Sequence, residues 1–252
     1  MSGLSVIVPC FNEEDGIPQL EEHLRALEQL FASNQRLLQF VLVDDGSSDK
    51  TLPLLETLSE GLQDAVVVTH GVNKGIGEAL KTGIAHSSMP WIAAIDSDCT
   101  YQPAALFPML LLAEQGADVV VGSPYAPKGQ VEGVPLWALV LSRGCSLLYR
   151  LALGSHVYTF TSMFRIYRRE QLLNAEFHAR GFLSMAEVLV DLIMTGAQVV
   201  DYPTTLRNRK FGRSKRQVAG LVESHLAMLW KVIKHRTGLE HEPRWASLAT
   251  ES

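Results

Sequence analysis

Two acidic residues stand one position apart where an apolar run ends, in the segment AAIDSDCTYQP (93–103). Along a strand, residues i and i+2 point the same way, so Asp96 and Asp98 would face one spot and repel each other. A divalent cation offsets such repulsion, because Mg²⁺ is held by one or two carboxylates together with substrate phosphates. We therefore predict a cation site that bridges a diphosphate. The alternative is that Asp-Ser-Asp forms a surface turn.

A second acidic pair ends another apolar run, in VLVDDGSSDKT (41–51). Ser48 or Asp49 is expected to cap the helix that follows, but a cap does not require two carboxylates. Asp44 is therefore predicted to accept hydrogen bonds from a base or a ribose, as an acidic strand end does in dinucleotide folds. The glycine-rich helix start NKGIGEALKTGI (73–84) fits phosphate binding and an ordinary helix start equally well.

Positive charge is concentrated later in the chain. The segment RNRKFGRSKR (207–216) supplies the cations that a diphosphate leaving group needs, with a solvated run of charges as the alternative. The apolar stretch 135–154 carries Arg143 and Arg150, seven positions apart and so on one face of a helix. This arrangement suits a lipid phosphate with a hydrocarbon tail. The alternative is a buried helix whose arginines reach solvent.

The elements that would position these groups alternate between strands and helices. Strands are expected at 4–8, 40–43, 65–69, 91–95 and 118–121, and their apolar residues fit strands covered by helices on both faces. Helices are expected around 17–31, 75–86 and 103–115. This order predicts a single α/β, Rossmann-like domain with a mostly parallel central sheet flanked by helices. Its ligands would bind at the carboxyl ends of the strands.

The second half of the chain is richer in helical sequence. We expect helices at 135–154, 168–177, 183–195 and 217–235, and strands in FTSMFRIY (160–167) and at 198–202. The last helix has an apolar face, Trp230 and basic flanks, which are features of an interfacial helix and also of one packed on its own domain. The expected boundaries are 1–215 for the main domain, 216–237 for this amphipathic helix and 238–252 for a tail.

Composition narrows the function classes. The net charge of −5 argues against a general nucleic-acid binder, and the widely separated Cys10, Cys99 and Cys145 indicate a reduced, cytoplasmic chain. The N-terminus lacks a basic region before its apolar run, so we expect a core strand there and no signal peptide. The longest uninterrupted apolar run, AALFPMLLLA (104–113), is about half of what a bilayer requires. We therefore expect no membrane-spanning helix.

Four segments in order, SVIVPCFNEE, VLVDDGSSDKT, NKGIGEAL and AAIDSDCTYQP, resemble the signatures of family 2 glycosyltransferases, which have the nucleotide-sugar-binding GT-A fold. TSMFRIYRRE (161–170) and RNRKFGRSK (207–215) are similar to the dolichyl- and polyprenyl-phosphate mannosyltransferase branch. The resemblance covers about residues 4–220. It implies inverting transfer of a hexose from a nucleotide diphosphate sugar such as GDP-mannose to a lipid phosphate, aided by Mg²⁺ or Mn²⁺. The enzyme would be peripheral on the cytoplasmic face of a membrane.

The resemblance also implies a role for each matching residue. The donor-binding residues would be Pro9, Asn12 and Glu14 on the first loop, Asp44 at the base, Asp96 and Asp98 at the metal and diphosphate, and Arg209, Ser214 and Lys215 over the phosphates. Gln102 is a further metal candidate. The chain departs from relatives that use lipid phosphates at Pro124 and Ala138, where those proteins often carry arginine, so the acceptor site is less defined than the donor site.

The acceptor and the catalytic groups depend on each other. An alcohol acceptor needs a general base, for which Glu187 is the candidate, whereas a phosphate acceptor is already an anion and needs a cation such as Arg143. Asp98 would act at the leaving diphosphate in both cases. A nucleotide-sugar-binding subunit without catalysis is the third possibility, against which the intact Asp96 and Asp98 argue. The sequence does not separate GDP-mannose from UDP-glucose.

Overall fold

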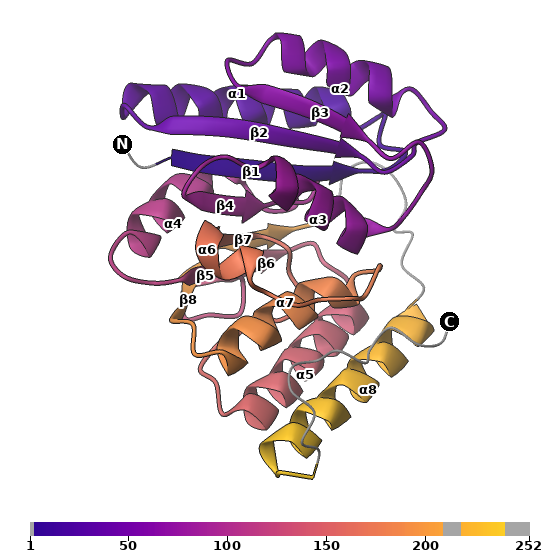
Figure 1. The fold of residues 1–252 in the computed structure, drawn as a ribbon, viewed down its shortest axis with the longest axis vertical. Helices are drawn as coiled ribbons and strands as arrows, with labels where there is room; N and C mark the ends of the chain where they lie inside the picture. The colour runs from indigo at the N-terminus through magenta and orange to yellow at the C-terminus, as the bar shows by residue number, and fades with distance from the viewer. Residues whose placement is uncertain (1–2, 209–217, 240–252) are drawn as a thin grey trace.

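The computed structural model describes residues 3–208 and 218–239 (Figure 1). The central sheet has seven strands, which are β1 (Gly3–Cys10), β2 (Leu37–Asp44), β3 (Ala65–Thr69), β4 (Trp91–Ala94), β5 (Val119–Ser123), β7 (Arg165–Arg168) and β8 (Val199–Pro203). A small second sheet pairs β6 (Gln130–Glu132) with β9 (Thr205–Arg207). The helices are α1 (Ile17–Ser33), α2 (Thr51–Glu60), α3 (Ile76–His86), the 3₁₀ turn η1 (Pro103–Ala105), α4 (Leu106–Ala113), α5 (Leu136–Leu153), α6 (Arg169–Leu173), α7 (Leu183–Met194) and α8 (Val218–Arg236).

Neighbouring strands of the central sheet follow the order β3-β2-β1-β4-β7-β5-β8. Its pairs are parallel except those of β7, which runs antiparallel to β4 and to β5. The chain moves outward from β1 through β2 to β3 and then returns to β4 on the other side of β1. Ligands bind at such a reversal, outside the carboxyl ends of the strands. The predicted α/β fold with a mostly parallel sheet is confirmed.

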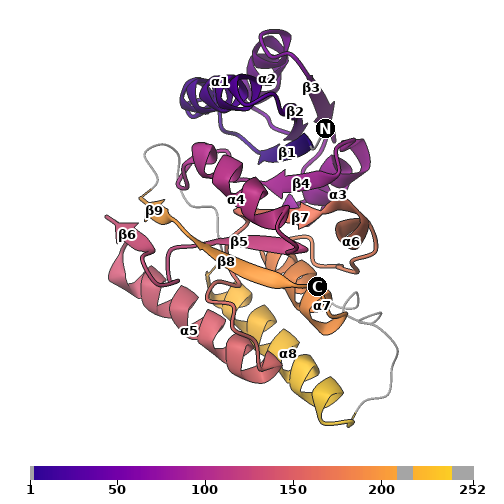
Figure 2. The same cartoon turned by 90° about the vertical axis from the view of Figure 1, so that its left-hand side faces the viewer.

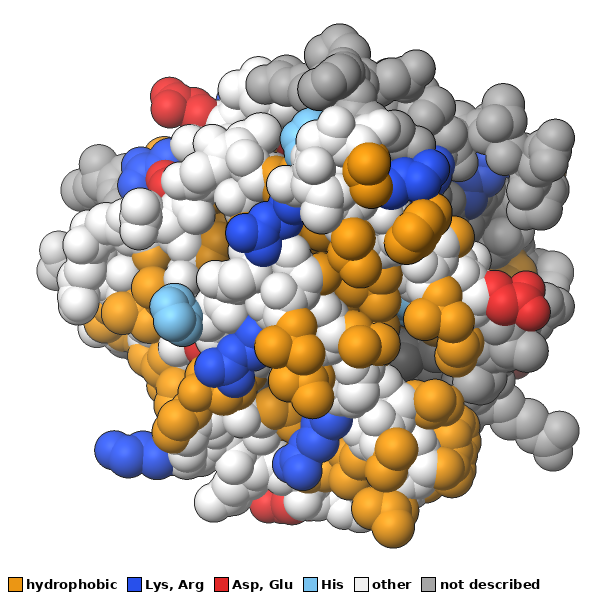
Figure 3. All heavy atoms as spheres, turned by 90° about the horizontal axis from the view of Figure 1, so that it is seen from below, with side chains coloured by type: hydrophobic (Ala, Val, Ile, Leu, Met, Phe, Trp, Pro, Cys, Tyr) orange, Lys and Arg blue, Asp and Glu red, His pale blue; other side chains and the backbone are white. Residues whose placement is uncertain are grey.

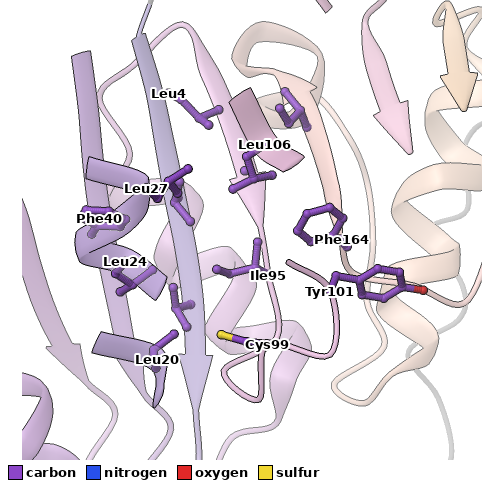
Figure 4. Close-up of a cluster of buried hydrophobic side chains, with 14 of the residues drawn as sticks. Leu4, Leu20, Leu24, Leu27, Phe40, Ile95, Cys99, Tyr101, Leu106 and Phe164 are labelled. Carbon is purple, nitrogen blue, oxygen red and sulfur yellow. The ribbon is translucent and has the colours of Figure 1, made fainter. Parts of the chain in front are cut away.

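Helices cover both faces of the sheet because successive strand residues point to opposite sides. Val6 and Val8 of β1 belong to a buried cluster with α1, α2 and α4, whereas Ile7 belongs to a second cluster with α3 and α7. Figure 4 shows part of the first cluster, with leucines of α1 against the strands. On the face of the sheet that α3 covers, the close contact with β1 requires a glycine, since a Cβ atom on Gly83 would lie 2.3 Å from Ile7 Cγ2.

The predicted strand 160–167 is only partly correct, because β7 begins at Arg165. The backbone before it bonds to side chains: Phe160 N–H donates to Ser146 Oγ (3.1 Å), and Phe160 C=O accepts from the Arg165 guanidinium (2.7 Å). These bonds hold the segment in an irregular path instead of a ladder. The helix expected after Ser48 and Asp49 is α2, which begins at Thr51, whereas strands β6 and β9 were not predicted.

The predicted helix 168–177 is also too long, since α6 contains only five residues. Beyond it, Glu176 N–H donates to Asp191 (3.1 Å) and His178 N–H donates to Glu187 (3.0 Å), both on α7. Carboxylates of α7 thus take the place of the carbonyl groups that a continuing helix would offer. The chain turns away from the helix axis as a result.

Helices α5 and α8 lie side by side at the end of the molecule opposite α1 and α2 (Figures 1 and 2). The Tyr149 hydroxyl of α5 lies 3.0 Å from His225 Nδ1 of α8. Helix α8 also places Met228, Leu229 and Val232 in the second buried cluster. The last helix therefore packs on its own domain. The predicted boundaries before and after it stay predictions, and the first of them lies outside the described residues.

Helix α5 differs from our expectation that no helix is fit to span a membrane. Among the described residues it is the one helix long and apolar enough to do so by length and composition, with a mean hydropathy of 1.3 and only 11% of it buried. Our expectation was based on the length of uninterrupted apolar runs in the sequence, and the apolar sequence of α5 is interrupted by Arg143 and Arg150. Buried helices of other proteins meet the same criterion, so no membrane topology follows from it.

Candidate functional site

A cavity of about 560 Å³ lies at the carboxyl ends of β1 and β4, where the strand order reverses. Its wall combines the loops after the first four strands with α5 and the segments around β7, α7 and β9. The wall residues from the first half include Pro9, Cys10, Phe11, Glu13, Asp45, Asn73, Gly75, Ile76, Asp96, Ser97, Asp98 and Tyr101. Those from the second half are Tyr125, Val134, Ala138, Leu139, Ser142, Thr161, Ser162, Met163, Gly181, Phe182, Leu206, Arg207 and Asn208.

The acidic pair lies on this wall. Asp96 and Asp98 follow β4 and are half-buried, and Asp98 Oδ1 accepts the Thr100 N–H (3.1 Å). The charge of the pair acts on its surroundings: burial and then the carboxylates of Asp98 and Asp96 raise the pKa of the Cys99 thiol to about 12. Gln102, by contrast, is exposed and lies outside the wall. The structure thus brings together two of the three predicted metal ligands.

The donor set on this wall fits a cation held jointly with phosphates. Within the described residues, no group of three or more His, Cys, Asp or Glu side chains is placed to hold a metal ion by itself. Two carboxylates facing an open cavity are what a Mg²⁺ or Mn²⁺ ion shared with a diphosphate requires from the protein. Such an ion would be held by Asp96 and Asp98 and would neutralise charge on the leaving group.

The predicted residues of the first loop have two different positions. Pro9 lies on the cavity wall. Asn12 and Glu14 lie outside it and bind the neighbouring loop, where Asn12 Oδ1 accepts Ser48 N–H (2.7 Å) and Glu14 Oε2 accepts Lys50 N–H (3.0 Å). Asn12 and Glu14 therefore join the loop after β1 to the loop after β2.

The two residues of the second acidic pair, Asp44 and Asp45, have different surroundings. Asp44 is 2% exposed and lies outside the cavity wall, where its oxygens accept Ser47 N–H (3.2 Å) and the Thr69 hydroxyl (2.8 Å). Asp45 lies on the wall and accepts two backbone N–H groups of the loop before α3, each at 2.9 Å. A base contact from Asp44 stays a prediction. Sequence reasoning did not assign a role to Asp45, although its place beside Asp44 was the available signal.

The predicted arginines of α5 are both stacked on tyrosines. The Arg143 guanidinium lies 4.8 Å from the ring centre of Tyr125, a wall residue, and the next residue on α5 toward its N-terminus, Ser142, is also on the wall. Arg143 is exposed, so its charge stands beside the cavity. Arg150 lies over Tyr158 at 4.6 Å, and neither residue belongs to the wall.

Glu187 is 3% exposed and is absent from the cavity wall. Its Oε2 accepts the backbone N–H groups of His178 (3.0 Å) and Ala179 (2.7 Å), while Oε1 has no hydrogen-bond partner in the described part of the chain. The segment that it holds reaches the cavity at Gly181 and Phe182. The geometry is that of a support for the wall, not of a base directed at an acceptor.

The cavity wall also contains hydroxyl residues for which no separate role was predicted. The hydroxyls of Ser142 and Thr161 lie 2.7 Å apart on the wall, and Ser162 follows. Below them Tyr101 stacks on Phe164 with ring centres 5.1 Å apart, and burial raises the Tyr101 pKa. The TSMFR segment was the signal that pointed to this region.

The basic segment is described only at its beginning. Arg207 and Asn208 lie on the cavity wall, and Arg207 Nε lies 3.0 Å from Glu132 Oε2 across the small sheet. The predicted Arg209, Ser214 and Lys215 lie outside the described residues.

The model of the glycosyl transferase family 2 matches residues 5–173, about two thirds of the chain. The chain belongs to this family. It is 30% identical over 227 residues to the polyprenol monophosphomannose synthase of Mycolicibacterium smegmatis, covering 87% of this chain and 83% of that protein. It is 27% identical over 240 residues to the dolichol-phosphate mannosyltransferase of Pyrococcus furiosus, covering 92% of this chain but 64% of that protein.

Solved structures agree on the fold. The chain superimposes on glucosyl-3-phosphoglycerate synthase from Mycobacterium tuberculosis, in complex with Mn²⁺, UDP and glucosyl-3-phosphoglycerate, with a TM-score of 0.64 and 22% identity over 96% of this chain and 82% of that one. Membership of family 2 and the named relatives make the protein a glycosyltransferase.

Proposed function

We propose that this glycosyltransferase transfers a hexose, mannose in the first instance, from a nucleotide diphosphate sugar to a polyprenyl or dolichyl phosphate. One observation carries the proposal: a single cavity has the Asp96–Asp98 pair on its wall together with an apolar helix, α5, whose outer side is exposed. The two named relatives, which are a polyprenol monophosphomannose synthase and a dolichol-phosphate mannosyltransferase, support the same acceptor class.

The donor is assigned to the half of the cavity formed by β1, β2 and β4. Pro9, Asp45 and the Asp96–Asp98 pair lie there, and Asn208 brings the start of the basic segment to the same cavity. A divalent cation at the acidic pair would supply charge neutralisation for the diphosphate. Arg209, Ser214 and Lys215 are proposed to add positive charge over the phosphates. The Mn²⁺- and Mg²⁺-containing complexes of glucosyl-3-phosphoglycerate synthase support a metal-dependent donor site in this fold.

The reaction is a direct displacement with inversion at the anomeric carbon. A non-bridging oxygen of the lipid phosphate forms the new bond to that carbon, while the bond from the carbon to the diphosphate breaks and its electron pair leaves with the nucleoside diphosphate. The phosphate is anionic at neutral pH, so no proton has to be removed. The chain's task is to hold the acceptor in line, and the exposed charge of Arg143 beside Tyr125 is placed for this.

The lipid tail is assigned to α5 and α8. Ala138, Leu139 and Ser142 of α5 lie on the cavity wall. The outer side of the two helices, which we call the apolar end face, exposes Leu136, Trp137, Val140, Leu141, Leu147, Leu148, Leu151, Val222, Leu226, Trp230 and Ile233. Figure 3 looks at this end of the molecule and shows hydrophobic side chains gathered there with basic ones among them.

The mixture of exposed leucine, tryptophan and basic side chains on this face is typical of surfaces that lie in a bilayer interface. We propose that the protein binds peripherally to the cytoplasmic face of a membrane through the apolar end face. The cavity would then open near the headgroups, where the lipid phosphate resides.

The decisive experiment measures transfer from GDP-mannose and from UDP-glucose, each with Mn²⁺ or Mg²⁺. The acceptors are a long-chain polyprenyl phosphate, a short-chain analogue, the matching polyprenyl alcohol and phosphoglyceric acid. We expect transfer to the polyprenyl phosphate and none to the alcohol. Transfer to the alcohol or to phosphoglyceric acid, without transfer to the lipid phosphate, would overturn the proposal. Loss of transfer on adding EDTA, restored by excess Mn²⁺, is the expected result for the metal.

A further inference from the structure

His70 and Thr82 lie outside the cavity but form a continuous, partly buried chain of hydrogen bonds to its wall. His70 Nδ1 lies 2.7 Å from Asp45 Oδ1, and His70 Nε2 lies 2.8 Å from Thr82 Oγ1 of α3. The two side chains of the first pair are only 4% and 5% exposed. Because an ionised carboxylate only accepts hydrogen bonds, Nδ1 is the donor to Asp45. The imidazole therefore has one orientation.

The Asp45 carboxylate in turn sets the loop before α3. Its Oδ1 also accepts Lys74 N–H, and its Oδ2 accepts Gly75 N–H, both at 2.9 Å. Asn73 and Gly75 of this loop lie on the cavity wall with Asp45. With three hydrogen bonds already accepted, this carboxylate serves chiefly to fix the loop that borders the donor.

The backbone of the same loop is closely packed against two other segments, which restricts its conformation. A Cβ atom on Gly46 would lie 2.2 Å from the carbonyl carbon of Val72, so the loops after β2 and β3 meet backbone to backbone. Gly75 has φ +94°, and a Cβ atom there would lie 2.4 Å from Arg180 O. Small changes in the Asp45 orientation would therefore move wall residues directly, and tight packing leaves no neighbouring space to absorb the shift.

We infer that His70 is a positioning residue for the donor, which acts by fixing Asp45 and through it the loop at Asn73 and Gly75. The inference rests on the proposed function, since it takes the ligand of this half of the cavity to be a nucleotide diphosphate sugar. It assigns to His70 no contact with the ligand. The acceptor half of the cavity, formed by α5 and the 161–163 segment, is on different elements and should not respond.

The test compares His70→Ala, His70→Asn and Thr82→Val with His86→Ala. Asparagine carries its amide nitrogen near the place of Nδ1 and keeps the donor to Asp45. His86 is an exposed histidine at the end of the same helix, with Nδ1 2.8 Å from the Thr82 carbonyl, and serves as the matched control. Calorimetry measures binding of GDP and of UDP with Mn²⁺. Steady-state kinetics measure KM for donor and acceptor separately.

We expect His70→Ala to weaken nucleoside diphosphate binding about 10-fold, the loss of one charge-assisted hydrogen bond, and to raise the donor KM without changing the acceptor KM. His70→Asn and His86→Ala should stay within about 2-fold of wild type, and Thr82→Val should fall between. If His70→Ala fails to fold, Thr82→Val still decides, because its intermediate loss is expected only if the hydrogen bonds of His70 position the loop. Unchanged binding in His70→Ala and Thr82→Val, or equal losses for donor and acceptor, would overturn the inference. Wild-type protein that binds neither nucleotide would refute the proposed function, and the inference would fall with it.

Discussion

Replacing Glu187 by glutamine and by alanine distinguishes a support for the cavity wall from a general base. In the structure, Oε2 accepts two backbone N–H groups, of His178 and Ala179. Glutamine keeps an oxygen for both bonds, whereas alanine leaves two buried donors without an acceptor. Each unsatisfied donor costs about 1–3 kcal/mol, so Glu187→Ala should lose about 2–6 kcal/mol of stability.

Glu187→Gln places an amide nitrogen where Oε1 has no hydrogen-bond partner among the described residues, and it removes a buried charge. These effects oppose each other, so we expect a loss below about 3 kcal/mol and turnover within about 10-fold of wild type. A general base differs in its effect on turnover: both variants, when folded, would lose roughly 10²–10⁴-fold in turnover, whatever their loss of stability.

Single-turnover rates with saturating donor, together with urea unfolding of each variant, make the comparison. Arg143→Ala is the reference, for which loss of a charge-assisted contact predicts roughly a 10- to 150-fold slower rate. Arg150→Ala is the matched control, since Arg150 lies off the cavity. A loss above about 100-fold in a fully folded Glu187→Gln, beside a small loss in Arg143→Ala, would refute our reasoning and restore the alcohol-acceptor hypothesis.

Three further predictions follow from the structure. Asp98→Asn should abolish Mn²⁺-dependent nucleotide binding in calorimetry and leave the unfolding midpoint within a few degrees; unchanged binding would exclude its metal role. Leu151→Ser with Trp230→Ser should reduce flotation with anionic vesicles, and should reduce activity on long-chain acceptors more than on short ones. The control Leu37→Ser changes an exposed leucine of β2, outside the apolar end face, and should do neither. Burial lowers the pKa of His225 to about 4 from 6.5, so the unfolded chain binds a proton that the folded chain does not, and the free energy of unfolding should fall by up to about 3 kcal/mol from pH 6.5 to 4. In His225→Gln this part of the pH dependence should disappear from urea-unfolding curves.

The alternation of strands and helices, and the edge of the sheet at which the acidic residues lie, could be predicted from the amino-acid sequence. Local periodicity was enough for this, because apolar strands and 3.6-residue helical patterns are properties of short segments. Asp96 and Asp98 follow β4, and Pro9 lies near the end of β1; these two strands are parallel, and the carboxyl ends of parallel strands meet at one edge. Their convergence on one cavity could therefore be predicted without coordinates.

The direction in which individual side chains point could not be predicted, because it depends on how the elements pack against one another. Asp44 and Asp45 are adjacent in sequence, yet the first binds Thr69 inside the fold and the second lies on the cavity wall. Glu187 was the candidate base for an alcohol acceptor, and its Oε2 accepts two N–H groups from a backbone segment eight and nine residues earlier. In each case the deciding partner comes from another element. Side-chain direction depends on hydrogen bonds formed after the elements pack, whereas periodicity records only which residues are buried.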